Sequence, residues 1–387
     1  MSLENEQSRT LRNTFSLYLD PVALTRNEVV AIVSSSMTIP SRRKDTFTAM
    51  KDNAVLIRDE QSLFEYLSKI FKEVFDRGDK VAVKLHMGEP GNRYFIKPAF
   101  TQRLCELLGE AGIEPFVFDT PVVYNSPRNN EQSYLKSAAA NGYDEESIGA
   151  PIVISNRSVE AKGTLMTYRI AKEVLDADGV LLLTHVKGHI ACGMGGAVKN
   201  IGMGCMAKET KGEIHTGGEP RYDEGCVQCG ICVENCPTEN IVIENERPVF
   251  GRTWCSGCSN CAIVCPEECI KPKNALFDKL LAEAAALAHE RFEKVYAVNV
   301  LKNISKLCDC VADSGPIIVD DIGYICAADM ISADAASLEV IRRATGKDDI
   351  FSEYNLRSSW DHVREAAAFL GREAETFIEE LPERERD

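Results

Sequence analysis

The sequence predicts an α/β fold, in which a mostly parallel sheet flanked by helices is interrupted by a small cysteine-rich α+β module. Short apolar segments of strand type alternate with amphipathic segments of helix type, which is the rhythm of βαβ units. Nine of the chain's 15 cysteines stand between Cys226 and Cys269, and the α/β rhythm resumes after them. The module is therefore expected to be an insertion into one α/β domain, and a tandem of two domains is the alternative.

The expected elements follow one another in βαβ order before the cysteines. We expect strands at 29–34, 81–86, 115–119, 152–155 and 180–185, and helices at 62–75, 98–111 and 170–175. After the cysteines, apolar residues recur at helical spacing over 276–292. Strands are then expected at 295–300, 316–319 and 324–326, and helices at 335–344 and 363–370. The acidic segment 373–387 is expected to fray.

Composition and charge restrict the class of protein. A chain of 387 residues that is 44% hydrophobic can bury a large core, and its net charge of −15 argues against a nucleic-acid partner. The N-terminus is polar, without the pattern of a signal or transit peptide, and the apolar stretch at 179–184 is far shorter than the ~20 residues of a membrane span. We expect no membrane segment, and a cytoplasmic location in which thiols stay reduced.

The cysteines form two runs with the same spacing, C-x2-C-x2-C-x3-C-P, offset by 29 residues. In such a run three thiolates bind one cubane, and the fourth binds the cluster of the other run, as in bacterial ferredoxins with two clusters. We expect one [4Fe-4S] cluster on Cys226, Cys229, Cys232 and Cys265, and a second on Cys255, Cys258, Cys261 and Cys236. Structural zinc would leave the third and fourth cysteine of each run unexplained. Cys269 is expected to be a packed thiol.

These boundaries divide the chain into three parts. Residues 1–221 are expected to form the first part of the α/β domain, 222–273 the ferredoxin-like module, and 274–387 the second part of the α/β domain.

A loop rich in glycine, histidine and lysine follows the strand expected at 180–185. The carboxyl end of a strand is where open α/β sheets bind ligands, and glycines let a backbone approach a ligand closely. The catalytic candidates are His185, Lys187, His189, Lys199 and His215, and the cofactor-binding candidates are Gly193, Gly195, Gly196, Asn200 and His86. Known phosphate loops do not match, because Val198 and Met194 stand where such loops need Gly and Lys. The alternative is that the glycines form tight turns and the histidines are core residues.

Three further groups are weaker candidates. Cys308 and Cys310 flank Asp309 and would share one face of an extended segment, where they bind metal or simply pack. Asp329 and Asp334 precede or open a helix, where a carboxylate is usually an N-cap. Glu89 and Asn92 follow His86 and are expected to face the same cleft.

The composite pattern resembles the family of iron-sulfur centre proteins called domain of unknown function 362. That family has a strand ending in K-x-H, an H-x-K-G-H run, G-G-A-x-K-N and a later His, which here are 84–86, 185–189, 195–200 and His215. The resemblance spans roughly residues 80–338, and the ferredoxin module stands in its usual place. The sequence departs from the family at Ala327 and Met330, where Ser and Pro are usual.

One loop is also similar to that of lactate racemase, in which a Lys anchors a nickel cofactor and a His ligates the nickel. The counterparts would be His189, 193–199 and His215. The Arg-rich substrate segment of the racemase is not evident in this sequence.

Three functions follow as hypotheses. The first is an oxidoreductase that takes electrons from a redox partner protein and passes them from the clusters to a small anionic substrate or cofactor held by the loop. The second is a non-catalytic ferredoxin-like electron carrier or docking protein. The third is a racemase-like enzyme, which needs an additional metal ion or small-molecule cofactor.

Overall fold

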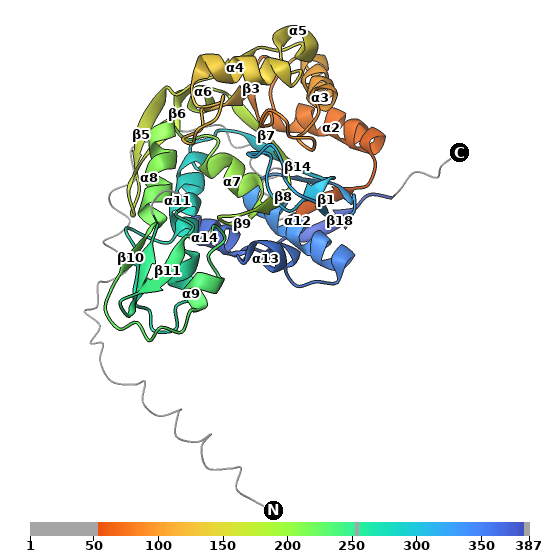
Figure 1. The fold of residues 1–387 in the computed structure, drawn as a ribbon. Helices are drawn as coiled ribbons and strands as arrows, with labels where there is room; N and C mark the ends of the chain where they lie inside the picture. The colour runs from red at the N-terminus through yellow and green to blue at the C-terminus, as the bar shows by residue number, and fades with distance from the viewer. Residues whose placement is uncertain (1–52, 252–254, 383–387) are drawn as a thin grey trace, which may run out of the picture. The chain divides into compact units, whose positions relative to one another are not determined.

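The fold is built on an eight-stranded sheet in the order β18-β1-β17-β14-β7-β2-β3-β4 (Figure 1). The computed structural model describes residues 53–251 and 255–382. Its sheet strands are β1 Asn53–Ile57, β2 Lys80–Lys84, β3 Glu114–Asp119, β4 Ile152–Ile154, β7 Gly179–His185, β14 Val295–Leu301, β17 Gly323–Ala327 and β18 Phe377–Glu380. β4, β3, β2, β7 and β14 pair in parallel, and β17 runs antiparallel to β14 and β1. The predicted fold class, a mostly parallel sheet, is confirmed.

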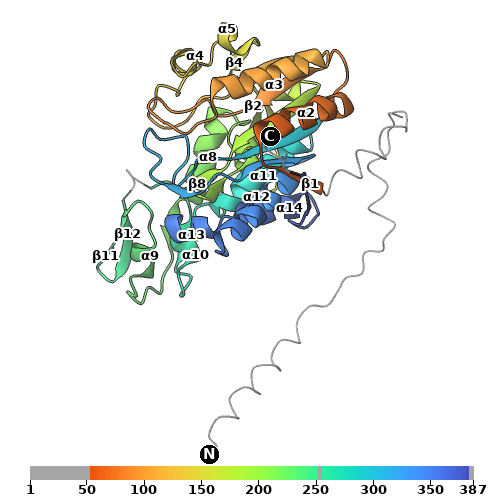
Figure 2. The ribbon, with the colours of Figure 1, turned by 90° about the vertical axis from the view of Figure 1, so that its right-hand side faces the viewer.

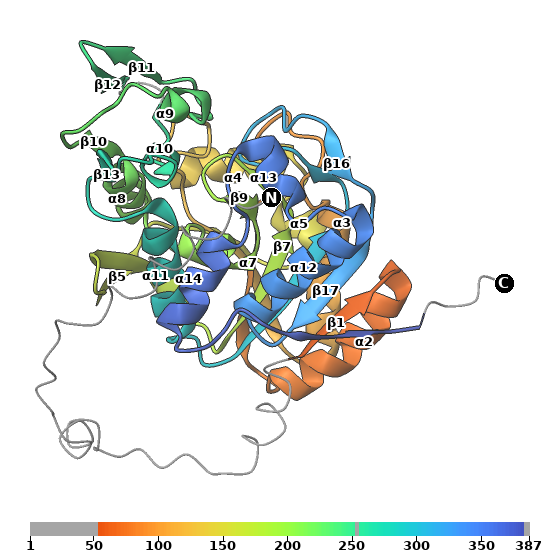
Figure 3. The ribbon, with the colours of Figure 1, turned by 90° about the horizontal axis from the view of Figure 1, so that it is seen from below.

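Helices cover both faces of this sheet, because successive strand residues point to opposite sides. In β2, Ala82 joins one hydrophobic core, and Val81 and Val83 join the other. One face packs against α2 Glu60–Val74, α3 Pro98–Glu110, α4 Glu131–Ala140 and α5 Glu145–Ile148. The opposite face packs against α7 Ala197–Gly202, α11 Phe277–His289, α12 Met330–Thr345 and α14 Asp361–Phe369 (Figures 2 and 3).

The remaining elements are short and join or cap the two layers. They are β5 Ser158–Lys162, β6 Thr167–Ala171, α6 Lys172–Leu175, β8 Lys187–His189, β9 Gly193–Gly195, α8 Lys208–Gly218, β15 Ile304–Ser305, β16 Ile317–Val319 and α13 Ile350–Asn355. Within the described ranges, none of the helices is long and apolar enough to cross a membrane.

Two expectations about these elements were wrong, and one lies outside the described residues. Of the helix expected at 170–175, only the part from Lys172 to Leu175 is helical, as α6. Before it, Tyr168 and Ile170 alternate into the core as part of β6, which pairs with β5. The acidic end was expected to fray, yet β18 pairs in parallel with β1. The strand expected at 29–34 is not among the described residues.

The cysteine-rich segment lies between α8 and α11, and the strands that flank it in the sequence, β7 and β14, are neighbours in the sheet. It contains two antiparallel strand pairs and two short helices. These are β10 Pro220–Tyr222 with β13 Ile270–Pro272, β11 Ile241–Glu244 with β12 Arg247–Phe250, α9 Ile231–Glu234 and α10 Asn260–Ile263. β14 thus pairs with β7 although the cysteine-rich segment stands between them in the sequence, and the division into an α/β domain with an inserted module stays a prediction.

Candidate functional site

A cavity of about 290 Å³ lies where the parallel strands end. β2 ends at Lys84, β3 at Asp119 and β7 at His185, and all three residues line it. The carboxyl ends of parallel strands meet at one edge of a sheet, where α/β proteins bind ligands. Of the predicted loop residues, His86, His185, Lys187, His189, Gly195, Gly196, Lys199, Asn200 and His215 line this cavity, and Gly193 does not.

The predicted glycine loop is a hairpin that leads into a helix. β8 pairs with β9, and Gly196 then caps α7, which carries Lys199 and Asn200. A Cβ on Gly196 would lie 2.4 Å from Oδ1 of Asp334, so glycine is needed for this carboxylate to reach the helix. Asp334 accepts hydrogen bonds from the backbone N–H groups of Ala197 (2.7 Å) and Val198 (2.9 Å). It therefore caps the helix that positions Lys199, and not its own helix as the sequence had suggested.

Gly193 has a structural reason to be glycine. Its φ is +73°, and a Cβ would lie 2.6 Å from the backbone oxygen atoms of Arg357 and Ser358. The position thus allows the hairpin to pack closely against the segment after α13.

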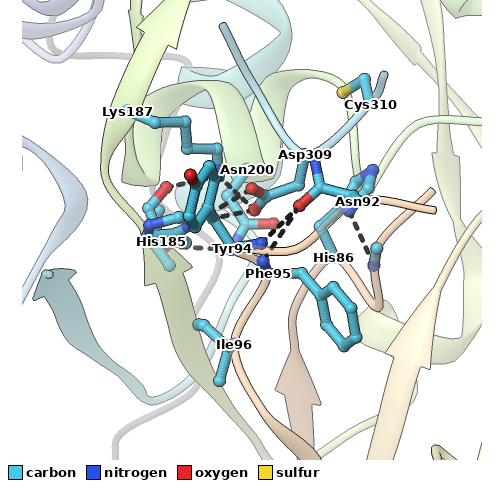
Figure 4. Close-up of polar contacts among 12 residues, drawn as sticks. His86, Asn92, Tyr94, Phe95, Ile96, His185, Lys187, Asn200, Asp309 and Cys310 are labelled. Carbon is cyan, nitrogen blue, oxygen red and sulfur yellow. Dashed lines mark hydrogen bonds and ion pairs between the residues drawn. The ribbon is translucent and has the colours of Figure 1, made fainter. Parts of the chain in front are cut away.

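Asp309 lies at the centre of a buried charge cluster (Figure 4). Its carboxylate is 3.0 Å from Nδ1 of His185 and 3.2 Å from Nζ of Lys187. Although burial favours the neutral acid, these two partners hold the pKa of Asp309 well below its usual value. Nε2 of His185 also lies 2.8 Å from the backbone oxygen of Lys302. His185 and Lys187 are thus fixed by protein partners, and their role is to hold Asp309 at the cavity wall.

His189 and His215 present opposite hydrogen-bonding groups. Nδ1 of His189 accepts from the N–H of Ala191 (3.1 Å), so the proton of the neutral ring belongs on Nε2. Nδ1 of His215 lies 2.7 Å from the backbone oxygen of Ser256 and donates to it, which leaves Nε2 as an acceptor. Burial, aided by Lys199, lowers the pKa of both rings, so both are neutral at pH 7. The pair offers the cavity one donor and one acceptor.

A third buried histidine gives a pH prediction. Burial, together with Arg357, lowers the pKa of His362 to about 3, and neither ring nitrogen has a hydrogen-bond partner in the described structure. In the unfolded chain the His362 ring is protonated below about pH 6.5, whereas in the folded chain it stays neutral down to about pH 3. The free energy of unfolding should therefore decrease progressively as pH falls from 6.5 toward 3. We expect His362→Met to flatten the acid slope by up to about 1.4 kcal/mol per pH unit. Denaturant unfolding of variant and parent at pH 7, 6 and 5 measures it, and parallel slopes would contradict it.

Asn200 joins α7 to the sheet. Its Nδ2 donates to the backbone oxygens of Lys84 and Leu183, both at 3.2 Å, and its Oδ1 accepts from Nζ of Lys84 at 2.9 Å. Lys84 in turn pairs with Asp119 at 3.0 Å, and both are almost fully buried. The predicted cofactor-binding Asn200 therefore has a positioning role: it fixes Lys199 relative to the strand ends.

Lys211 is a site residue that the sequence reasoning missed. It stands one helical turn before His215 in α8, and that i, i+4 spacing is the signal that could have found it. Its Nζ donates to Oγ1 of Thr120 (2.6 Å) and to the backbone oxygen of Pro121 (2.8 Å). Burial lowers its pKa to about 7, with Asp119 opposing and Lys84 adding to the shift. Lys211 can therefore exchange a proton near neutral pH.

Arg128 was also missed, because it comes from a loop with no motif. Its guanidinium pairs with Glu89 at 2.6 Å, and its Nη1 lies 2.8 Å from Nε2 of His86. Glu89 and Asn92 were expected to face the cleft, and neither lines the cavity. Asn92 instead donates from Nδ2 to the backbone oxygen of Val311 (2.8 Å). These two residues support the cavity wall from behind.

The eight predicted cluster cysteines gather in two pockets of the inserted module. Cys226, Cys229, Cys232 and Cys265 line one, and Cys236, Cys255, Cys258 and Cys261 line the other. This is the grouping that crossed ligation of two cubanes requires, and thiolates are the donors that such clusters take. Cys269, expected to be a packed thiol, is buried and also lines the pocket of Cys226, with its sulfur 3.4 Å from that of Cys265. Among the described residues, no group of three or more His, Cys, Asp or Glu side chains is close enough together to hold a single metal ion.

The second cysteine pocket touches the cavity. Ser256 follows Cys255 and lines both the pocket and the cavity, and His215 is bonded to its backbone oxygen. The contact is tight, because a Cβ on Gly257 would lie 1.9 Å from the backbone oxygen of His215. Phe277, which also lines the cavity, packs against the His215 ring with centroids 5.2 Å apart. A single residue thus separates the pocket from the cavity.

Comparisons with known proteins agree with these features. A family model described as "Domain of unknown function (DUF362)" matches residues 81–339. A thylakoid-associated protein of Synechocystis is 29% identical over 145 residues, which are 36% of this chain and 42% of that protein. An uncharacterized ferredoxin of Methanocaldococcus jannaschii is 34% identical over 73 residues, 17% of this chain and 48% of that protein. A ferredoxin of Chlorobaculum thiosulfatiphilum is 40% identical over 53 residues, 12% of this chain and 87% of that protein. The chain spans less than half the length of the first two relatives.

Solved structures resemble the chain only distantly. A protein of Thermotoga maritima has a TM-score of 0.40 at 11% identity and covers 75% of this chain and 59% of its own. The lactate racemase apoprotein of Thermoanaerobacterium thermosaccharolyticum has a TM-score of 0.38 at 11% identity, with 79% and 60% covered.

Proposed function

The chain belongs to the family described as domain of unknown function 362 and carries a ferredoxin-type iron-sulfur module, and from these premises we propose that it passes electrons from two [4Fe-4S] clusters to a small anionic ligand in the cavity. When bound, each cluster would supply one electron at a time. The observation that carries the proposal is the position of Ser256, which lines both the second cysteine pocket and the cavity. A ligand in the cavity is therefore within one residue of a cysteine ligand.

The charge of the cavity favours an anion. Lys84, Lys187 and Arg128 each have a carboxylate partner, at 3.0, 3.2 and 2.6 Å, so their charges are balanced. Lys199 has its Nζ 4.0 Å from Sγ of Cys310 and, among the described residues, no carboxylate in ion-pair contact. No carboxylate balances its positive charge, and a buried charge attracts an opposite one strongly, whether that charge is on a ligand or on the neighbouring sulfur.

Proton transfer falls to the two neutral histidines. Nε2–H of His189 can donate to a ligand, and Nε2 of His215 can accept from it. Nδ1 of His215 is bonded to the backbone oxygen of Ser256, which follows the expected cluster ligand Cys255. Reduction of that cluster and proton transfer at His215 would therefore be coupled through Ser256.

The proposal includes a redox partner protein that supplies the electrons, and a cytoplasmic location. The redox partner would bind at the pocket that contains Cys229, because Cys229 is the exposed member of the eight cysteines. Electrons would enter there and leave at the cavity.

Lys199→Met tests the proposal. Chain prepared without oxygen would be titrated with pyruvate, oxalate and phosphate, followed by calorimetry and by the electron paramagnetic resonance of the reduced clusters. We expect at least one anion to bind the parent and to shift its spectrum, and Lys199→Met to weaken that binding by about tenfold or more, roughly 1.4 kcal/mol. Lys136→Met, which removes an exposed lysine of α4, is the matched control and should bind as the parent does.

The alternatives give different results in the same experiment. A non-catalytic electron carrier would show normal clusters and no anion response in either protein. A racemase-like enzyme would bind its ligand equally well whether the clusters are oxidised or reduced, and would hold a third metal in elemental analysis.

A further inference from the structure

Two cysteines outside the cluster module share the cavity wall. Cys308 and Cys310 lie in a turn after β15, closed by a hydrogen bond from the N–H of Val311 to the backbone oxygen of Cys308 (3.3 Å). Both cysteines line the cavity, and both are free thiols. Asp309, between them, points to His185 and Lys187 (Figure 4), whereas the two cysteines line the cavity and the sulfur of Cys310 lies 4.0 Å from Nζ of Lys199.

The turn is held rigidly. The N–H of Glu89 donates to the backbone oxygen of Asp309 at 2.9 Å. The hydroxyl of Tyr124 donates to the backbone oxygen of Cys310 at 3.3 Å. Asn92 holds the next residue, as described above. Contacts from two loops, one with Glu89 and Asn92 and the other with Tyr124, thus hold the backbone of the turn that carries both cysteines, which is the support that a reactive site requires.

The surroundings of Cys310 favour a thiolate. Hydrogen bonding from Cys308 lowers the pKa of Cys310 well below its usual value, and Lys199 and His86 lower it further against the effect of burial. The pKa of Cys308 is raised for the complementary reason, first by its bond to Cys310 and then by burial. The pair therefore shares one proton, as the reduced form of a reactive dithiol does.

Other buried cysteines of the chain show the contrast. Burial raises the pKa of Cys192 and Cys205 to about 12, and that of Cys326 is also raised by burial. Such thiols are inert. Cys310 differs from them because Cys308 donates a hydrogen bond to it and because Nζ of Lys199 lies 4.0 Å from its sulfur, and both lower its pKa against the effect of burial.

We propose that Cys308 and Cys310 form a redox-active pair that stores two electrons beside the ligand as a reduced dithiol and releases them by closing to a disulfide. Opening the disulfide consumes two electrons and one proton, breaks the sulfur–sulfur bond, and leaves a thiol on Cys308 and a thiolate on Cys310. Closing it returns two electrons to an oxidising anionic ligand in the cavity, together with the Cys308 proton and one from solvent. Lys199 faces the sulfur of Cys310 in the reduced state, and no thiolate remains once the disulfide has closed.

The pair would join two kinds of electron transfer. Clusters move electrons singly, and most organic ligands are reduced by two electrons at once. A dithiol can collect two single electrons and release them together. The source of these electrons rests on the proposed function, whereas the disulfide itself does not.

The test is a redox titration of the cluster-loaded chain in glutathione buffers without oxygen, followed by acid quenching, alkylation and mass spectrometry of the tryptic peptide 307–342. We expect a reversible two-electron transition that protects Cys308 and Cys310 from alkylation and leaves Cys326, in the same peptide, alkylated. Cys308→Ser and Cys310→Ser should each abolish it, and Cys326→Ser should not. Full alkylation of both cysteines at every potential that leaves the clusters intact would overturn the proposal.

Two further measurements separate this proposal from the proposed function. In Cys308→Ser, the alkylation rate of Cys310 should rise with pH at a lower midpoint than that of a free thiol, and Lys199→Met should raise that midpoint; an ordinary thiol midpoint in both would count against the pair. Photoreduction of the clusters should open the disulfide, and a disulfide that stays closed would overturn its role as a relay. Anion binding that depends on Lys199 can hold or fail independently of either result.

Discussion

Replacing Cys236 and Cys255 together with alanine is expected to remove about half of the iron of the chain, whereas replacing Cys236 and Cys226 together is expected to remove nearly all of it. The two pockets group Cys236 with Cys255, and Cys226 with Cys265. Two substitutions in one ligand set damage one cluster twice, and substitutions in different sets damage both. The parent should hold roughly eight irons per chain.

Iron and sulfide analysis of anaerobically prepared chains measures this result. The single variant Cys236→Ala should already show about four irons, so the second substitution decides the ligand set. Cys105→Ala, in α3 on the far side of the sheet from α11, is the control and should keep all eight. If ligation were not crossed, the two double variants would exchange their iron contents.

Asp334→Ala is expected to destabilise the chain by about 3 kcal/mol and to abolish anion binding. The carboxylate is fully buried and accepts from the N–H groups of Ala197 and Val198 and from Nδ2 of Asn299 (2.8 Å). Removing it leaves buried donors without partners, each of which costs about 1–3 kcal/mol. The first turn of α7 would loosen, and Lys199 would lose its fixed position.

Denaturant unfolding and the pyruvate titration measure the two parts of this prediction. Asp334→Asn keeps the shape of the side chain and one acceptor oxygen, so its loss of stability should be smaller than that of Asp334→Ala. Glu339→Gln, on the same helix but paired with the surface residues Arg342 and Arg343, should change stability by less than about 1 kcal/mol. Equal losses in Asp334→Ala and Glu339→Gln would show that the cap contributes nothing.

Much of the fold could be predicted because its signals are local. Every residue of β7 is buried, and such a continuous apolar run marks a strand covered on both faces. The cysteine runs could be paired across the repeat because their spacing reflects the shape of a cubane. The position of the loop at a strand's carboxyl end followed from the same pattern, and nine of the ten predicted loop residues line the cavity.

Other features depend on contacts between residues far apart in the sequence, which no local pattern contains. Asp309 holds His185 across 124 residues, a contact that the sequence did not predict, and the catalytic role expected of His185 stays a prediction. Arg128 reaches His86 from an irregular loop. β18 was missed because its residues are acidic and mostly exposed, and it is a strand only because β1 offers an edge.

The position of β1 in the sheet has a consequence for how the chain is made. β1 is bordered by β17 and β18, which leave the ribosome some 270 and 320 residues later. Four strands stand next to one another in the sheet, in the order β7-β2-β3-β4, and all of them are synthesised early. They can therefore pair before the neighbours of β1 have been synthesised. The cysteine-rich module is synthesised after these four strands and before β14, which pairs with β7. The cysteine pockets are therefore complete in sequence before the sheet beside them can close, and pairings between such distant strands form slowly.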